Sequence, residues 1–82
     1  DSEIVSAYPN PTYDELYLHL KESAQVIVVS DMAGRIVLQK ELDPGQRTVV
    51  LSQKWRELEQ GLYILTFKNQ NELVGSLKVL KK

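Results

Sequence analysis

Few residues of this chain could do chemistry. It contains one histidine, His19, and no cysteine. Glu15, Tyr17 and His19 fall on one face of an alternating segment, where Glu15 and His19 could reach a common metal ion. Two ligands from one strand are too few for a specific site, so no metal is predicted. A surface histidine on a polar strand face is the favoured interpretation.

The neighbouring carboxylates are also poor candidates for catalysis. Asp14 and Glu15 are adjacent, and Glu57 and Glu59 flank one leucine. Catalytic carboxylate pairs lie opposite each other across a cleft, in surroundings that separate their pKa values. No glycine-rich phosphate loop occurs, because the glycines are scattered singly: Gly34, Gly45, Gly61 and Gly75. The sequence predicts a module that is not an enzyme and needs no cofactor.

Composition restricts the class of protein further. The 82 residues have room for one modest core, so residues 1–82 are expected to form a single domain. The net charge of −1 gives no general attraction to nucleic acid. No apolar run approaches the roughly 18 residues of a membrane span. The chain starts at Asp1 without a methionine, which suggests a piece cut from a longer precursor.

Charge is distributed unevenly along the chain. Residues 1–20 carry four carboxylates and no lysine or arginine, a local charge of −4. Residues 68–82 carry four lysines against Glu72, a local charge of +3. A solvated surface with polar ends is the favoured interpretation. The alternative is a basic C-terminal segment that is presented to a partner.

Alternation of apolar residues predicts strands throughout. The leucines of residues 16–20 fall on every second position, as in a half-buried strand, and residues 24–30 contain a β-branched run typical of a central strand. Asp31–Gly34 is predicted to be a hairpin turn with a bulge glycine, and Asp43–Gln46 a type II turn. Residues 52–60 form either one helical turn with Ser52 as a possible cap, or a loop that places Trp55 over the core.

Counted together, the segments predict about seven short strands with turns at regular spacing. This pattern is typical of an all-β, antiparallel β-sandwich. The expected strands cover residues 4–7, 16–20, 24–30, 35–41, 47–51, 62–67 and 74–81.

The aromatic residues raise one alternative function. Exposed aromatic side chains in a row could stack against sugar rings, as in a carbohydrate-binding module. Tyr8, Tyr13 and Tyr17 lie in different local contexts in the sequence, and Tyr63 sits in an apolar strand. We therefore expect no aromatic platform, and Tyr8 is expected to cap one end of the sandwich.

Three motifs in order point to a known family. The corner Tyr8-Pro9-Asn10-Pro11 is rigid, because proline fixes its own φ and holds the preceding residue extended. It is followed by Asp31-Met32-Ala33-Gly34-Arg35, by Gly61-Leu62-Tyr63 and by a final strand that ends in lysines. In this order and spacing, from Ile4 to Lys82, the chain resembles the C-terminal sorting domains of the type IX (Por) secretion system of Bacteroidetes.

The resemblance implies a fold and a function. Members have an Ig-like β-sandwich fold and are fused to the C-terminus of a cargo protein. A signal peptide on the precursor delivers it to the periplasm, where the outer-membrane translocation apparatus recognises the sorting domain. A sortase-like peptidase usually removes the domain, and the cargo reaches the cell surface or is secreted. The alternative is a structural, adhesive or carbohydrate-binding Ig-like module of a surface protein.

The resemblance also separates scaffold residues from recognition residues. Residues expected to shape the sandwich are Tyr8, Pro9, Asn10, Pro11, Asp31, Gly34, Gly61 and Tyr63. Residues expected to meet the translocation or sortase proteins are Arg35 and, in the last strand, Gly75, Lys78, Val79, Leu80, Lys81 and Lys82. The segment between Leu51 and Gly61 is longer than in many members. Weak homodimerisation through an exposed edge strand stays open.

Overall fold

The computed structural model describes residues 5–8 and 14–82. The motif residues Pro9, Asn10 and Pro11, together with Tyr13, lie outside the described residues. The described elements are β1 (Val5–Tyr8), β2 (Leu16–Leu20), β3 (Val26–Asp31), β4 (Ile36–Glu41), β5 (Thr48–Leu51), α1 (Gln53–Arg56), β6 (Gly61–Asn69) and β7 (Glu72–Lys81).

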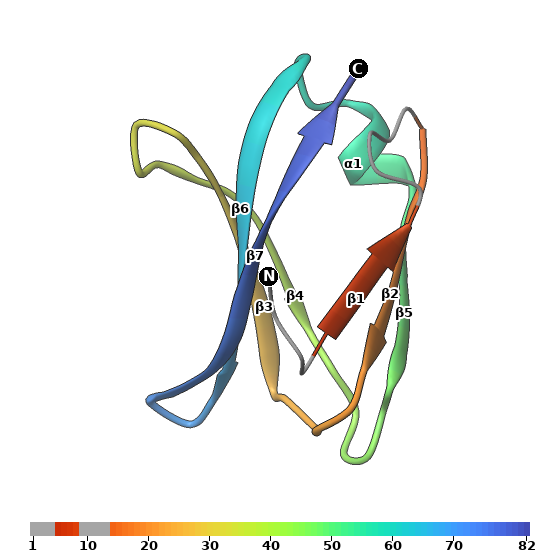
Figure 1. The fold of residues 1–82 in the computed structure, drawn as a ribbon, viewed down its shortest axis with the longest axis vertical. Helices are drawn as coiled ribbons and strands as arrows, with labels where there is room; N and C mark the ends of the chain where they lie inside the picture. The colour runs from red at the N-terminus through yellow and green to blue at the C-terminus, as the bar shows by residue number, and fades with distance from the viewer. Residues whose placement is uncertain (1–4, 9–13) are drawn as a thin grey trace.

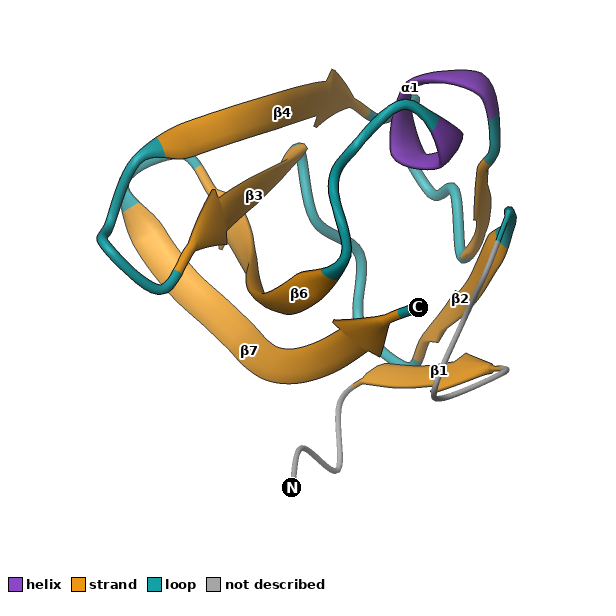
Figure 2. Cartoon of the chain, turned by 90° about the horizontal axis from the view of Figure 1, so that it is seen from above, coloured by secondary structure: helices purple, strands orange, loops and turns teal. Residues whose placement is uncertain are grey.

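The strands form two antiparallel sheets that face each other (Figures 1 and 2). The small sheet has the order β1-β2-β5, and the large sheet has the order β4-β3-β6-β7. The chain crosses between the sheets after β2, β4 and β5, as expected of Ig-like sandwiches, whose connections are Greek keys. The predicted all-β sandwich of about seven strands is confirmed.

The core lies between the two sheets because alternate side chains of each strand point inward. Leu16, Leu18 and Leu20 are almost fully buried, while His19 between them is exposed, as predicted. Burial on this scale is the main favourable contribution to folding. The buried apolar residues are Leu16, Leu18, Leu20, Ala24, Ile27, Val29, Val49, Leu51, Trp55, Tyr63, Leu65, Phe67 and Val79.

The segment after β5 forms the predicted helical turn. In α1 the backbone N–H of Arg56 donates to the carbonyl oxygen of Ser52 at 2.8 Å. The Ser52 side chain makes no capping hydrogen bond, so the expected cap is absent. Trp55 is completely buried, and its ring meets the Tyr63 ring edge-on with centroids 5.5 Å apart. Such an aromatic pair adds about 1 kcal/mol to the stabilisation from burial.

Both predicted turns are confirmed by their backbone geometry. The N–H of Gly34 donates to the carbonyl oxygen of Asp31 at 3.0 Å, and Gly34 has a φ of 91°. The N–H of Asp31 also donates to the carbonyl oxygen of Arg35 at 3.0 Å, so Gly34 is the extra residue of the bulge that closes the turn. In the second turn the N–H of Gln46 donates to Asp43 at 3.0 Å, and Gly45 has a φ of 79°.

The structure brings together two tyrosines that are distant in the sequence. Tyr8 and Tyr17 lie directly opposite each other on β1 and β2, with ring centroids 5.6 Å apart and planes inclined by 51°. Their separation in sequence concealed this contact, which depends on strand pairing. Tyr8 is 55% exposed, and the Tyr17 hydroxyl donates to Glu15 Oε1 at 2.7 Å. The tilted rings do not form a flat stacking platform.

We expect replacement of Trp55 by alanine to destabilise the domain strongly. The substitution would empty the space that the indole fills in the core, and such truncations cost about 3–5 kcal/mol. Urea unfolding followed by circular dichroism measures the loss. Met32→Ala is the control, because Met32 is 55% exposed in a turn and should change stability by no more than about 0.5 kcal/mol. Equal effects of the two substitutions would contradict the assigned core.

Candidate functional site

The second and third motifs meet at one end of the sandwich. The sheet register places Asp31 opposite Tyr63 and Gly61 opposite Lys81. The β3–β4 turn and the end of β7 therefore lie at the same end of the large sheet, on either side of β6. In Figure 1 the loop that leads into β6 and the end of β7 lie together near the C-terminus, and the β3–β4 turn projects to the left. A surface hollow of about 480 Å³ is lined by both motifs, including Asp31, Arg35, Gly61 and Tyr63. We call this region the motif end.

Asp31 organises the turn from inside. Its Oδ1 accepts hydrogen bonds from the backbone N–H groups of Ala33 and Arg35, both at 3.0 Å. Its Oδ2 accepts a bond from Arg35 Nε at 2.9 Å. The backbone hydrogen bond from Arg35, aided by its guanidinium and by the Ala33 N–H, lowers the pKa of Asp31. The Arg35 side chain is nevertheless 81% exposed, so it is held in place while facing solvent.

Two side chains from the large sheet hold the loop of residues 57–60. The Tyr63 hydroxyl donates to the carbonyl oxygen of Glu59 at 2.7 Å, and burial raises the pKa of that phenol. The Lys81 ammonium group donates to the carbonyl oxygen of Leu58 at 2.8 Å. The longer segment between β5 and β6 is thus fastened to a motif residue and to the end of β7.

Alternation along β7 divides the predicted recognition residues into two groups. Lys78, Leu80 and Lys82 are exposed, with Leu80 at 39%. Val79 and Lys81 point inward and are buried, at 0% and 6% exposed. The predicted recognition role does not fit these two residues, because Val79 packs in the core and the Lys81 ammonium group is turned to the carbonyl oxygen of Leu58. Buried lysines need such a partner to offset the loss of hydration.

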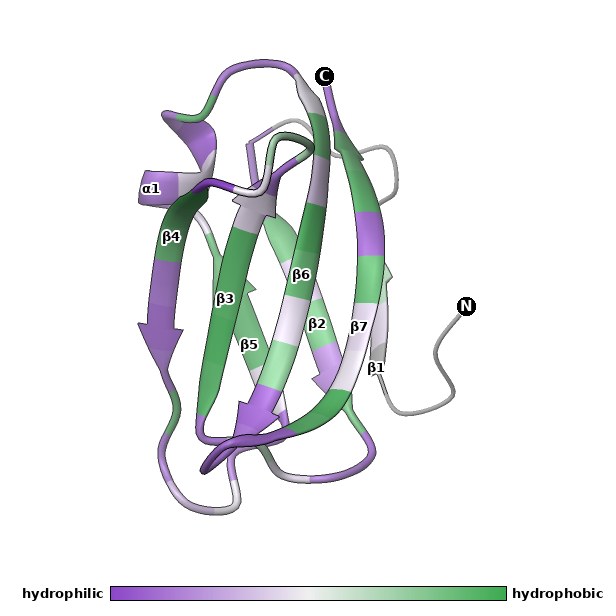
Figure 3. Ribbon diagram, turned by 90° about the vertical axis from the view of Figure 1, so that its left-hand side faces the viewer, coloured by the Kyte–Doolittle hydropathy of each residue, from purple (hydrophilic) through white to green (hydrophobic). Residues whose placement is uncertain are grey.

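Cross-strand pairing adds two residues that the sequence motifs did not indicate. Leu62 lies opposite Leu80, and Ile64 lies opposite Lys78. Leu62 is 36% exposed and Ile64 is half-buried, on the outer face of the large sheet. Figure 3 views this sheet from outside. The alternation of side chains along a strand already indicated that Leu62 and Ile64 share a face. Their cross-strand partners follow only from the β6–β7 register. We call Lys78, Leu80, Lys82, Leu62 and Ile64 the terminal strip.

The remaining recognition residue, Gly75, is half-buried opposite Phe67 in the middle of β7. It lies away from the motif end, next to the register shift between Phe67 and Lys68. A structural role in this irregular pairing is consistent with its position.

Other kinds of site receive no support from the described part of the chain. No group of three or more histidine, cysteine, aspartate or glutamate side chains there is arranged to hold a metal ion. In the same residues, no helix has the length and apolarity that a bilayer crossing requires.

Comparison with known proteins decides the family. The family model for the secretion system C-terminal sorting domain matches residues 6–82, almost the whole chain. The chain belongs to this family. No curated protein and no solved structure matched the chain. The predicted resemblance to type IX sorting domains is therefore confirmed.

Membership of this family establishes the general function of the domain. A sorting domain of the type IX system is a secretion signal rather than a catalytic domain. It is fused to a cargo that precedes it and directs that cargo, through the type IX machinery, to the cell surface or the medium. The confirmed family does not by itself identify which residues of the sorting domain are contacted.

The bond from Lys81 predicts a difference between two adjacent lysines. Lys81→Met would keep the buried chain but leave the Leu58 carbonyl oxygen without its partner, at a cost of about 1–3 kcal/mol. Lys82→Met changes an exposed residue and should alter stability by less than about 0.5 kcal/mol. Urea unfolding monitored by Trp55 fluorescence measures both. Equal stability of the two variants would show that the bond contributes nothing.

The lowered pKa of Asp31 predicts a pH-dependent contribution to stability. A carboxyl group whose folded pKa lies below its usual value of 3.8 stabilises the fold above that pH. This contribution disappears as pH falls through the folded pKa. We expect Asp31→Asn to be less stable than the natural chain at neutral pH, with the difference shrinking as the pH is lowered below 3.8. A difference that stays constant over this range would contradict the assignment.

Proposed function

We propose that the sorting domain is recognised through its terminal strip by a component of the outer-membrane type IX apparatus. The supporting observation is the alternation at the end of β7. Lys78, Leu80 and Lys82 face solvent, while Val79 and Lys81 fasten the same segment to the core. The signal is therefore a rigid surface on a folded domain rather than a loose tail.

The chemistry of the strip defines the surface that it fits. Leu62 and Leu80 form an exposed apolar pair, and Lys78 and Lys82 add positive charge. A complementary receptor surface would combine an apolar patch with carboxylates, which also accelerate the encounter. The strip lies on β7, an edge strand of the large sheet, and on its neighbour β6.

Arg35 is a second contact in this proposal. The β3–β4 turn and the end of β7 both lie at the motif end, and Asp31 fixes the Arg35 side chain through Nε. Such a preorganised cation loses less conformational entropy on binding than a free one. Asp31, Gly34, Gly61 and Tyr63 then act as scaffold for the contacting residues.

The wider route is also part of the proposal. The cargo with its sorting domain passes through the periplasm, the translocation apparatus recognises the domain, and a sortase-like peptidase then removes it.

Charge reversal at two lysines tests recognition directly. We expect Lys78→Glu to reduce secretion of a reporter fused ahead of residues 1–82 by about tenfold or more, because it places a carboxylate in the strip. Lys68→Glu is the control. Lys68 is exposed on the same sheet but pairs with Val26, the first residue of β3, and so lies away from the motif end. Secreted reporter is measured in cells with and without the type IX machinery. Equal secretion of both variants would reject the strip as the signal.

An apolar pair of substitutions tests the second half of the strip. Leu80 and Leu73 are both exposed on β7, but at opposite ends of the strand. We expect Leu80→Gln to impair secretion and Leu73→Gln to leave it unchanged, with similar melting temperatures for both. Point variants are sharper than deletion of residues 78–82, which would also remove the buried Val79. Normal secretion of Leu80→Gln would favour a spacer or adhesive module in place of a strip-borne signal.

A further inference from the structure

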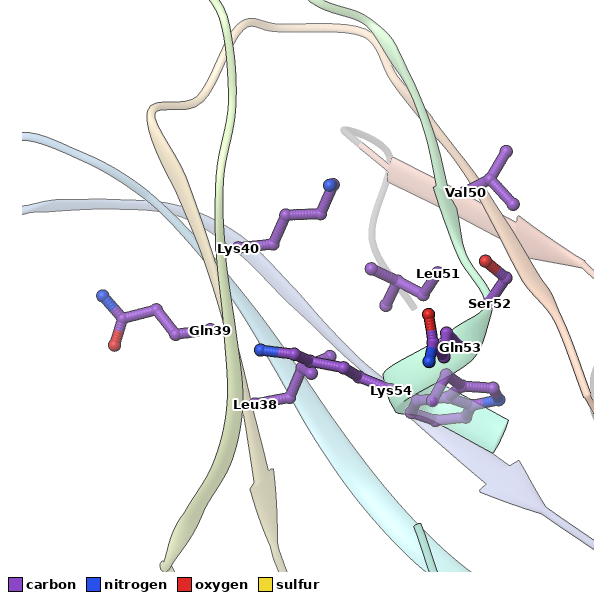
Figure 4. Close-up of a pocket in the computed structure, with 9 residues that line it drawn as sticks. Leu38, Gln39, Lys40, Val50, Leu51, Ser52, Gln53 and Lys54 are labelled. Carbon is purple, nitrogen blue, oxygen red and sulfur yellow. The ribbon is translucent and has the colours of Figure 1, made fainter. Parts of the chain in front are cut away.

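The two open sides of the sandwich differ. On one side the edge strands β1 and β7 are in contact. On the other side the edge strands β4 and β5 leave a groove of about 290 Å³ between them (Figure 4). This groove lies at the opposite edge of the large sheet from β7 and contains none of the terminal strip.

The groove has an apolar floor. Leu51 and Trp55 line it from the core, Leu38 contributes from β4, and Val50 adds an exposed rim. Leu51 is 4% exposed and Val50 is 45% exposed. An apolar side chain entering here would contact the core directly without displacing it.

Two lysines supply the charge of the groove. Figure 4 shows the Lys40 side chain reaching from β4 toward β5, and the Lys54 side chain reaching from α1 toward β4. None of the described residues that line the groove is acidic. Among the described residues, neither ammonium group has a carboxylate within ion-pairing distance. The groove therefore combines an apolar floor with two cations whose charge is not neutralised locally.

Both edge strands also offer backbone groups to this side. The N–H of Leu42 donates to the carbonyl oxygen of Gln25, so the backbone of Leu42 faces β3. Backbone groups of successive residues in a strand point to opposite sides, and those of Gln39, three positions earlier, therefore point away from β3. The carbonyl oxygen of Arg47 accepts a hydrogen bond from the N–H of Leu20, so the backbone of Arg47 faces β2. By the same alternation, the backbone groups of Val50, three positions later, point away from β2. A strand laid along either edge would find donors and acceptors in register.

We propose that this groove binds an extended peptide segment of a partner protein, with acidic and apolar side chains two positions apart. In an extended chain such side chains lie on one face, about 7 Å apart. The acidic group meets Lys40 and Lys54, and the apolar group covers Leu38 and Leu51. Backbone pairing with the free edge of β4 or β5 completes the site. This second contact is independent of the terminal strip.

A peptide titration tests the proposal. The capped peptide TETVTET is added to the ¹⁵N-labelled chain of residues 1–82, with TKTVTKT as the matched control. We expect saturable changes at the amides of Gln39 and Val50 and at the Trp55 indole with the acidic peptide alone. Lys40→Gln combined with Lys54→Gln should weaken binding about tenfold or more. Lys21→Gln combined with Lys68→Gln is the control and should bind as the natural chain does.

Several outcomes would overturn the proposal. The groove is not the site if the acidic peptide causes no saturable change, if both peptides bind equally, or if the changes fall on β7. Changes in the same amides on concentrating the chain without peptide would assign the groove to a second copy. Because the titration measures binding without secretion, its failure leaves the proposed role of the terminal strip standing, and failure of the secretion tests leaves the groove standing.

Discussion

The pairing of β7 with β6 is the constraint on which the site depends. Its register sets Gly61 opposite Lys81 and Leu62 opposite Leu80, and thereby decides which side chains face the core. A shift of one residue would exchange the buried and exposed sets along the whole strand. Val79 at 0% exposure and the bond from Lys81 to Leu58 both resist that shift. The surface at the motif end thus follows from core packing.

Much of the fold could be predicted because its signals are local. Period two identified the strands, and aspartate followed by glycine identified the turn at Asp31. Contacts across strands were less accessible. The Tyr8–Tyr17 pair and the partners of Leu62 and Ile64 depend on which strands are neighbours and in what register. Sequence spacing carries little information about either.

Lys81 illustrates the limit for the candidate site. Alternation placed it on the same face as Leu77 and Val79, yet its charge favoured assignment to the surface. The deciding factor is the carbonyl oxygen of Leu58, which the loop of residues 57–60 brings within 2.8 Å of the ammonium group. A long segment that seemed incidental to the family motifs thus supplies the partner that makes burial of this lysine favourable.

The different open sides of the sandwich suggest a division of roles. The contact between β1 and β7 joins the two sheets on the side of the sandwich that carries β7. The opposite side, between β4 and β5, leaves an apolar groove and two lysines that have no counter-charge among the residues that the structure describes. Edge strands in stable monomers are usually covered or blunted. Lys40 and Lys54 disfavour the pairing of basic or neutral strands with this edge and favour the pairing of acidic strands. The same two charges therefore limit nonspecific pairing and select the partner.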